Sequence, residues 1–163
     1  MTIKTFNINT DKTAFVRAYL PDSIAGLSFC EKRPAVLIFP GGGYEYCSDR
    51  EGEPIALQYL ALGYAAFVVT YSCNERFPEP LMDAAYIFYK IRMRAEEFKI
   101  DPQKMAVLGC SAGGHLAGCL ATMWSDIALT KTIGCEPEDL RPNAAILCYP
   151  VISGVTAPHE GSF

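Results

Sequence analysis

Short apolar segments alternate with amphipathic ones along most of the chain. Five segments have the length and composition of strands: residues 13–20, 35–39, 64–70, 105–108 and 144–148. The segments 35–39 and 64–70 are apolar at successive positions, which is typical of strands whose two faces are both buried. Proline or glycine follows several of these segments, as expected where a strand ends.

Between the predicted strands the pattern becomes helical. A segment that starts at Pro54 is followed by Gly63, the usual punctuation of a helix. From Pro80 to Phe98, apolar residues recur at spacings of three and four, as in a helix that packs on a sheet. A further helix is expected over residues 111–123. This alternation predicts an α/β fold: a mainly parallel sheet with helices on both faces, which binds ligands beyond the carboxyl ends of its strands.

Length and charge narrow the class of protein. The chain has 163 residues, of which 50% are hydrophobic and 20% charged, and we expect a single globular domain over residues 1–163. Its net charge is −4, and no basic cluster is evident, which argues against a nucleic-acid or membrane partner. Lys90, Arg92 and Arg94 are predicted to lie on one exposed helix face.

The lack of an evident targeting signal and the pattern of cysteines predict a cytoplasmic location. No apolar run approaches the roughly 18 residues of a membrane helix, and the first residues lack the apolar core of a signal peptide. The seven cysteines form no C-x-x-C pair and are expected to be reduced, mostly buried thiols. Neither a metal site nor a cofactor is predicted.

A serine turn carries the strongest chemical signal. Gly109-Cys110-Ser111-Ala112-Gly113 fits the pattern G-x-S-x-G, with a predicted strand before it and a predicted helix after it. A sharp turn of this kind strains its central residue and requires small neighbours two positions away. Ser111 is therefore the predicted nucleophile, placed at the helix N-terminus where developing negative charge is favoured. Cys110 is expected to be accessible to thiol reagents but not catalytic.

Other interpretations of these glycines fit less well. A dinucleotide-binding fingerprint needs glycine where Ser111 stands, and a phosphate-binding loop would put His115 at its lysine position. With Cys110 as the nucleophile, Leu108 and Ala112 would occupy the positions that must be small. A glycine-rich turn that serves packing alone stays open as an alternative.

A second glycine motif follows the strand at residues 35–39. Three consecutive glycines let the backbone fold back and aim N–H groups at a bound oxygen. Together with the serine turn, the N–H groups of Gly42, Gly43 and Ala112 are predicted to form an oxyanion hole. Tyr44 comes next and is expected either to line an acyl or sugar pocket or to pack against the fold. A flexible loop is the alternative for the motif as a whole.

These motifs resemble those of the α/β-hydrolase family. The segments that carry the resemblance are residues 40–44, 80–84, 100–102, 107–117 and 148–153. Within the family, the chain is most similar to esterases related to hormone-sensitive lipase and to the acetyl-xylan-esterase-like branch, from about Phe15 to its last residue. The resemblance implies hydrolysis of a small-molecule carboxylic ester through an acyl-serine intermediate, without a cofactor. Acetylated sugars or other small acyl esters are the implied substrates.

The resemblance also predicts that the catalytic set is incomplete. A serine nucleophile needs a base, and the base needs a carboxylate. In this family they follow the serine as acid and then histidine, after two further strands, so we expect a C-terminally truncated hydrolase domain without them. His115 is expected to be a packed, hydrogen-bonded residue, and His159 to lie in a loop that leads toward a cap. Asp139 precedes the strand at 144–148 and should lie at the opposite, amino end of the sheet.

Further expectations concern the edge of the sheet, the function and four polar residues. Without a neighbour, the strand at 144–148 leaves an apolar sheet edge exposed, which favours self-association. A non-catalytic binding or scaffold module and a peptidase on the same fold are the alternative functions. Asp83 is expected to be structural, and Arg50, Glu51 and Glu53 to form a solvated loop.

Overall fold

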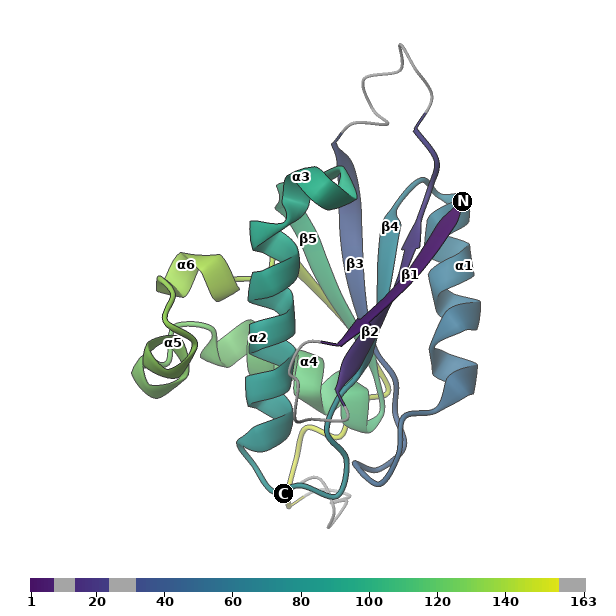
Figure 1. Cartoon of the computed structure of the whole chain (residues 1–163). Helices are drawn as coiled ribbons and strands as arrows, with labels where there is room; N and C mark the ends of the chain where they lie inside the picture. Colours follow the sequence, from purple (N-terminus) through teal and green to yellow (C-terminus); the bar gives the residue numbers. More distant parts are fainter. Residues whose placement is uncertain (8–13, 24–31, 156–163) are drawn as a thin grey trace.

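Six strands form one sheet in the computed structural model, which describes residues 1–7, 14–23 and 32–155 (Figure 1). The strands are β1 (Thr2–Asn7), β2 (Phe15–Leu20), β3 (Arg33–Phe39), β4 (Ala65–Thr70), β5 (Ile100–Cys110) and β6 (Ala144–Cys148). Their order is β1-β2-β4-β3-β5-β6, and the pairings from β4 to β6 are all parallel, whereas β2 is antiparallel to both its neighbours. The predicted mainly parallel α/β sheet is confirmed.

Helices cover both faces of this sheet. They are η2 (Asp49–Glu51, a 3-10 turn), α1 (Glu53–Ala61), α2 (Glu79–Met93), α3 (Ala95–Phe98), α4 (Ala112–Met123), α5 (Ile127–Ile133) and α6 (Pro137–Leu140). Helix α1 packs on one face, and α2 and α4 pack on the other (Figure 1). Within the described residues, no helix combines the length and hydrophobicity needed to cross a bilayer.

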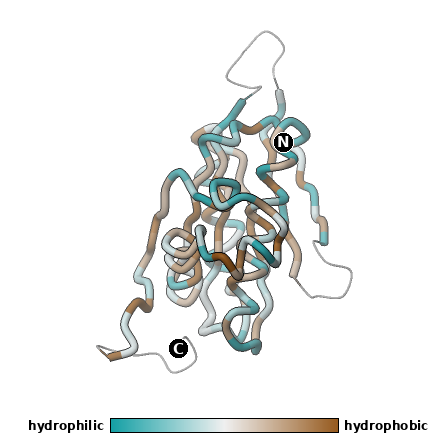
Figure 2. The backbone as a smooth tube through the Cα atoms, turned by 90° about the vertical axis from the view of Figure 1, so that its left-hand side faces the viewer, coloured by the Kyte–Doolittle hydropathy of each residue, from teal (hydrophilic) through white to brown (hydrophobic). Residues whose placement is uncertain are grey.

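Strand β3 shows why successive positions are apolar. Val36 and Ile38 belong to the cluster under α1, while Leu37 and Phe39 belong to the cluster under α2 and α4, and none of the four is exposed. A strand covered on both faces needs apolar side chains on both. In Figure 2, hydrophobic positions lie both in the middle of the molecule and along the outer segment that leads toward the C-terminus.

The boundaries differ from the prediction in several places. The predicted helix over residues 80–98 is interrupted at Arg94 and divides into α2 and α3. Strand β5 begins at Ile100 instead of residue 105. Strand β1 and helices α5 and α6 were not expected. Helix α5 has an ordinary start signal, because the Asp126 carboxylate accepts hydrogen bonds from two backbone amides of its first turn.

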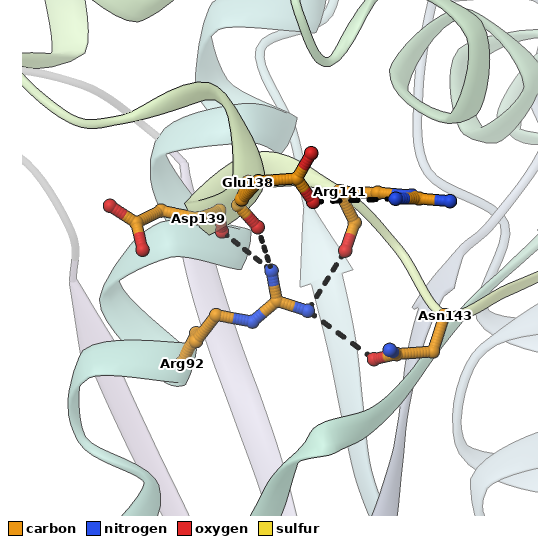
Figure 3. A network of polar contacts seen from close by, with 5 residues as sticks. All are labelled: Arg92, Glu138, Asp139, Arg141 and Asn143. Atoms are coloured by element: carbon orange, nitrogen blue, oxygen red, sulfur yellow. Dashed lines mark hydrogen bonds and ion pairs between the residues drawn. The ribbon is translucent and has the colours of Figure 1, made fainter.

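Arg92 is buried, which corrects the expectation that it lies on an exposed helix face. Only 8% of it is exposed, because α6 packs over this part of α2. Its guanidinium donates to the carbonyls of Glu138, Asp139 and Arg141 at 2.8–2.9 Å, and to Oδ1 of Asn143 at 3.3 Å (Figure 3). Burial lowers the pKa of Arg92. The side chain therefore joins α2 to the segment that leads into β6.

Strand β6 is the edge strand on this side of the sheet, as far as the structure describes the chain. Its backbone pairs with β5 on one side only. Ile146 and Leu147 are 36% and 41% exposed, although both are large and apolar. The expected exposed apolar edge is present.

Candidate active site

Ser111 lies in the turn between β5 and α4. Its backbone angles, φ 52° and ψ −118°, belong to a region that favours glycine, so the turn is strained as predicted. Its N–H donates to the carbonyl of Cys148 at 3.0 Å, and its carbonyl accepts from the N–H of His115 at 3.0 Å. The β5–β6 ladder and the first turn of α4 together hold the serine in place.

Gly109 and Gly113 are small because the backbone is closely packed there. A Cβ atom at Gly109 would lie 1.9 Å from the carbonyl oxygen of Gly113. A Cβ atom at Gly113 would lie 2.0 Å from the carbonyl oxygen of Phe39 and 2.5 Å from that of Pro40. The turn therefore brings β5, α4 and the end of β3 into backbone contact, which is the steric requirement of the G-x-S-x-G pattern.

Backbone strain at Ser111 has a measurable consequence. We expect Ser111→Gly to raise the free energy of unfolding by about 1 kcal/mol, because glycine adopts this conformation without strain. Ser111→Ala keeps the strain and should stay within about 0.5 kcal/mol of the parent. Urea denaturation followed by circular dichroism measures both. Equal stability of the two variants would contradict a strained serine.

The glycine loop folds back on itself directly after β3. Gly42, Gly43 and Tyr44 all have positive φ values, of 133°, 66° and 64°. The carbonyl of Gly42 accepts backbone hydrogen bonds from Glu45 and Tyr46, which closes a tight turn. At Gly42 a side chain is also excluded by space, since a Cβ atom would lie 2.0 Å from the carbonyl oxygen of Tyr46.

The loop lies directly against the serine turn. A Cβ atom at Gly41 would lie 3.0 Å from Cβ of Ser111. Among the described residues, no acceptor is bonded to the N–H groups of Gly42, Gly43 or Ala112. The structure thus places the loop that carries Gly42 and Gly43 against the predicted nucleophile, and Ala112 directly follows that nucleophile.

Glu51 is a site residue that sequence reasoning missed. Its Oε2 accepts a hydrogen bond from the N–H of Gly41 at 2.7 Å, and its Oε1 accepts one from the hydroxyl of Tyr149 at 2.9 Å. The carboxylate therefore links the glycine loop to the segment after β6, and the expectation of a solvated loop is wrong for Glu51. Contacts with Cys110 and Glu51 raise the pKa of Tyr149.

His115 is packed and hydrogen-bonded, as expected. Its Nδ1 lies 2.7 Å from the hydroxyl of Tyr44, and its Nε2 lies 3.5 Å from Sγ of Cys119. Burial lowers the pKa of His115 and raises that of Tyr44. Because both ring nitrogens contact other side chains, His115 is not placed to take the proton of Ser111. Tyr44 also packs edge-on against the rings of Tyr71 and His115, which is the packing role of the two expected for it.

The remaining candidates have other surroundings. Cys110 is 2% exposed, because its side chain packs in the cluster under α1, so the expectation that thiol reagents reach it is wrong; burial raises its pKa to about 11. Asp83 is buried and accepts a hydrogen bond from the N–H of Ser72, a structural contact. Asp139 lies in α6, before the amino end of β6. His159 lies outside the described residues, and within them no cluster of three metal-ligating side chains occurs.

Comparison with curated proteins identifies relatives that are much longer than this chain. The chain is 36% identical over 138 residues to endo-1,4-beta-xylanase B of Butyrivibrio fibrisolvens. It is 33% identical over 155 residues to an acetylxylan esterase of Xylanibacter ruminicola. These alignments cover 80% and 91% of the chain but only 21% and 28% of the relatives.

Solved structures share the arrangement described above. MGS-M1, an α/β-hydrolase from a deep-sea metagenome library of the Medee basin, matches with a TM-score of 0.81 at 45% identity, over 94% of this chain and 58% of its own. An acetyl ester-xyloside bifunctional hydrolase from Caldicellulosiruptor lactoaceticus matches with a TM-score of 0.77 at 33% identity, over 96% of this chain and 56% of its own. The chain thus spans little more than half of either structure. Residues 25–151, which include the glycine loop and the serine turn, match the BD-FAE family model, and the chain belongs to this family of α/β-hydrolases.

Proposed function

We propose that the protein is a serine carboxylic-ester hydrolase that acts on small acyl esters, acetyl esters of sugars foremost. The observation that carries the proposal is the contact between the strained Ser111 turn and the glycine loop. A strained nucleophile beside free backbone N–H groups is the arrangement that acyl transfer requires. The printed names of the relatives support the substrate class, since they include an acetylxylan esterase and an acetyl ester-xyloside hydrolase.

In the proposed reaction, Oγ of Ser111 attacks the ester carbonyl carbon and loses its proton to a base. The carbonyl oxygen becomes an oxyanion that accepts hydrogen bonds from the N–H groups of Gly42, Gly43 and Ala112. The alcohol leaves with the proton held by the base, and water then hydrolyses the acyl-serine. The positive end of the α4 dipole at Ser111 stabilises the same negative charge.

The general base and its acid form a separate part of the proposal. We place both outside the described residues, because both ring nitrogens of His115 contact other side chains and Asp139 lies toward the amino end of the sheet. This fits relatives whose structures extend well beyond the part that this chain matches. His159, a continuation of the protein beyond residue 163 and a segment of another chain are the sources that an experiment must separate.

A fluorophosphonate probe tests the nucleophile directly. We expect the intact mass of the purified protein to rise by one adduct, and Ser111→Ala to abolish that rise, because the probe reacts only with an activated hydroxyl. Ser125→Ala, which removes an exposed hydroxyl after α4, is the matched control and should label like the parent. Loss of the adduct in a His159→Ala variant would assign the base to this chain.

Absence of any adduct would contradict an activated serine in this chain and favour the non-catalytic binding module. If the adduct forms, turnover of p-nitrophenyl acetate against a short peptide separates an esterase from a peptidase. We expect ester cleavage to dominate. Peptide cleavage at a comparable rate would overturn the substrate class.

A second copy of the chain is the partner that we propose for the β6 edge. Ile146 and Leu147 lie partly exposed on a strand whose outer edge has no partner among the described residues, a usual route to strand addition between chains. Size-exclusion chromatography with light scattering should therefore show a dimer or a larger species. Ile146→Lys should shift the protein toward monomer, whereas Thr122→Lys, which adds the same charge on the exposed side of α4, should not. A monomer at high concentration would contradict the proposal.

A further inference from the structure

Cys47 and Cys73 lie face to face beside the glycine loop. Their Sγ atoms are 3.8 Å apart, although the two residues are separated by 26 positions in the sequence. Cys47 follows the glycine loop, and Cys73 lies shortly after the end of β4. Both side chains are partly exposed and both carry free thiols. The pair therefore joins two segments of chain, one of which contains the proposed oxyanion donors.

The backbone around the pair holds the two thiols in this position. The hydroxyl of Tyr71 donates to the carbonyl of Pro40 at 2.7 Å. Asn74 donates through its N–H to the carbonyl of Tyr44 at 2.7 Å, and through Nδ2 to the carbonyl of Glu45 at 3.1 Å. These contacts lie on both sides of the cysteines and do not involve sulfur, so the two segments are joined whatever the state of the thiols.

A shared acceptor also directs the thiols toward each other. Sγ of Cys73 lies 3.4 Å from the carbonyl oxygen of Tyr71, and Sγ of Cys47 lies 3.9 Å from the same oxygen. Both thiols donate toward this oxygen, so the sulfur atoms approach the same point from two segments. A disulfide requires a further approach of the sulfur atoms to about 2.05 Å, which side-chain rotation can supply where the backbone is already close.

We propose that Cys47 and Cys73 form an oxidative modification site, which a small disulfide such as oxidised glutathione converts into a disulfide that joins the glycine loop to the segment after β4. The site goes beyond ester hydrolysis and does not depend on it. Cys110, the cysteine beside the predicted nucleophile, is buried in the cluster under α1 and is not open to such a reagent.

The chemistry proceeds by two thiol–disulfide exchanges. The thiolate of Cys73 attacks one sulfur of oxidised glutathione, forms a mixed disulfide and releases one glutathione thiolate. The thiolate of Cys47 then attacks the sulfur of Cys73 and releases the second glutathione. Two protein thiols are oxidised, one glutathione disulfide is reduced to two glutathione molecules, and the two protons pass to the departing thiolates.

The surroundings of the two thiols predict how the rate of their oxidation depends on pH. Burial raises the pKa of Cys47 to about 12 and also raises that of Cys73. Only a small fraction of either thiol is ionised at neutral pH, and the thiolate is the attacking species. Oxidation should therefore be slow at pH 7 and accelerate by up to about tenfold per pH unit as the pH rises toward these pKa values.

Mass spectrometry of the oxidised protein tests the proposal. The folded chain is incubated with oxidised glutathione at pH 8.5, unfolded, and alkylated at its remaining thiols. We expect two of the seven cysteines to be protected, a peptide cross-link between positions 47 and 73, and full reversal by dithiothreitol. The cross-link should raise the midpoint of thermal unfolding by about 5 °C or more, since it closes a long loop.

Matched variants decide whether the pair is responsible. Cys47→Ser and Cys73→Ser should each abolish the cross-link, whereas Cys119→Ser should leave it intact. A cross-link that maps to Cys110 and Cys148, or seven alkylated thiols after oxidation, would overturn the proposal. So would an equal rate of cross-linking in 8 M urea, because it would show that the fold does not bring these thiols together.

Discussion

Gly113→Ala is expected to lower the free energy of unfolding by about 3 kcal/mol or more, because the new methyl group clashes with the backbone at the end of β3. Its Cβ atom would lie 2.0 Å and 2.5 Å from the carbonyl oxygens of Phe39 and Pro40. Backbone at the end of a central strand cannot rotate away as a flexible side chain can. The clash must therefore move α4 away from β3 or prevent the Ser111 turn from forming.

Gly118→Ala is the matched control for this prediction. Gly118 lies on the same helix, and its Cβ atom would lie 3.7 Å from Cδ1 of Leu147, an ordinary contact. Alanine is a better helix former than glycine, so the free energy of unfolding of this variant should rise by about 0.5–1 kcal/mol. Urea denaturation monitored by circular dichroism gives both values. A loss below 1 kcal/mol for Gly113→Ala would show that the turn tolerates a side chain.

Arg92→Ala is expected to cost about 2–3 kcal/mol of unfolding free energy, because it removes the donor shared by several partly buried acceptors. The carbonyls of Glu138, Asp139 and Arg141 would lose their hydrogen bonds to the guanidinium. The variant would also leave a void against Phe88, whose ring lies 4.6 Å from the guanidinium carbon.

Lys90→Ala provides the control on the same helix. The ammonium of Lys90 lies 5.0 Å from the Tyr86 ring and bonds to no cluster of carbonyls in the described part of the chain, so its loss should lower the free energy of unfolding by less than about 1 kcal/mol. The stability loss of Arg92→Lys should lie between the losses of the two alanine variants, because a single ammonium cannot reach acceptors on four residues. Equal stability of Arg92→Ala and Lys90→Ala in chemical denaturation would contradict the role assigned to Arg92.

The elements that could be predicted correctly are those whose physical requirements lie within a short stretch of sequence. The alternation of Val36 and Ile38 with Leu37 and Phe39 placed β3 in the interior, because a covered strand needs apolar side chains on both faces. The Ser111 turn could be located because its steric requirements fall within five consecutive residues. Strand β1 escaped detection, since most of its side chains are exposed and its pairing with β2 rests on the main chain.

The rest of the candidate site depends on contacts that no short pattern contains. Glu51 contacts Gly41 and Tyr149, which are 10 and 98 positions away from it. Such contacts arise only when the strand ends meet at one edge of the sheet. The same holds for Arg92, whose side chain looks exposed on an isolated helix and becomes buried once α6 packs against it.

The strand order also bears on the sequence of events during synthesis. Strand β4 lies between β2 and β3, so neither of these earlier strands can complete its pairing until β4 has left the ribosome. After that point each new strand adds to the outer edge, β5 beside β3 and then β6 beside β5, without displacing an existing pair. Of the six strands described, β6 is therefore the last to leave the ribosome and the last to become available for pairing.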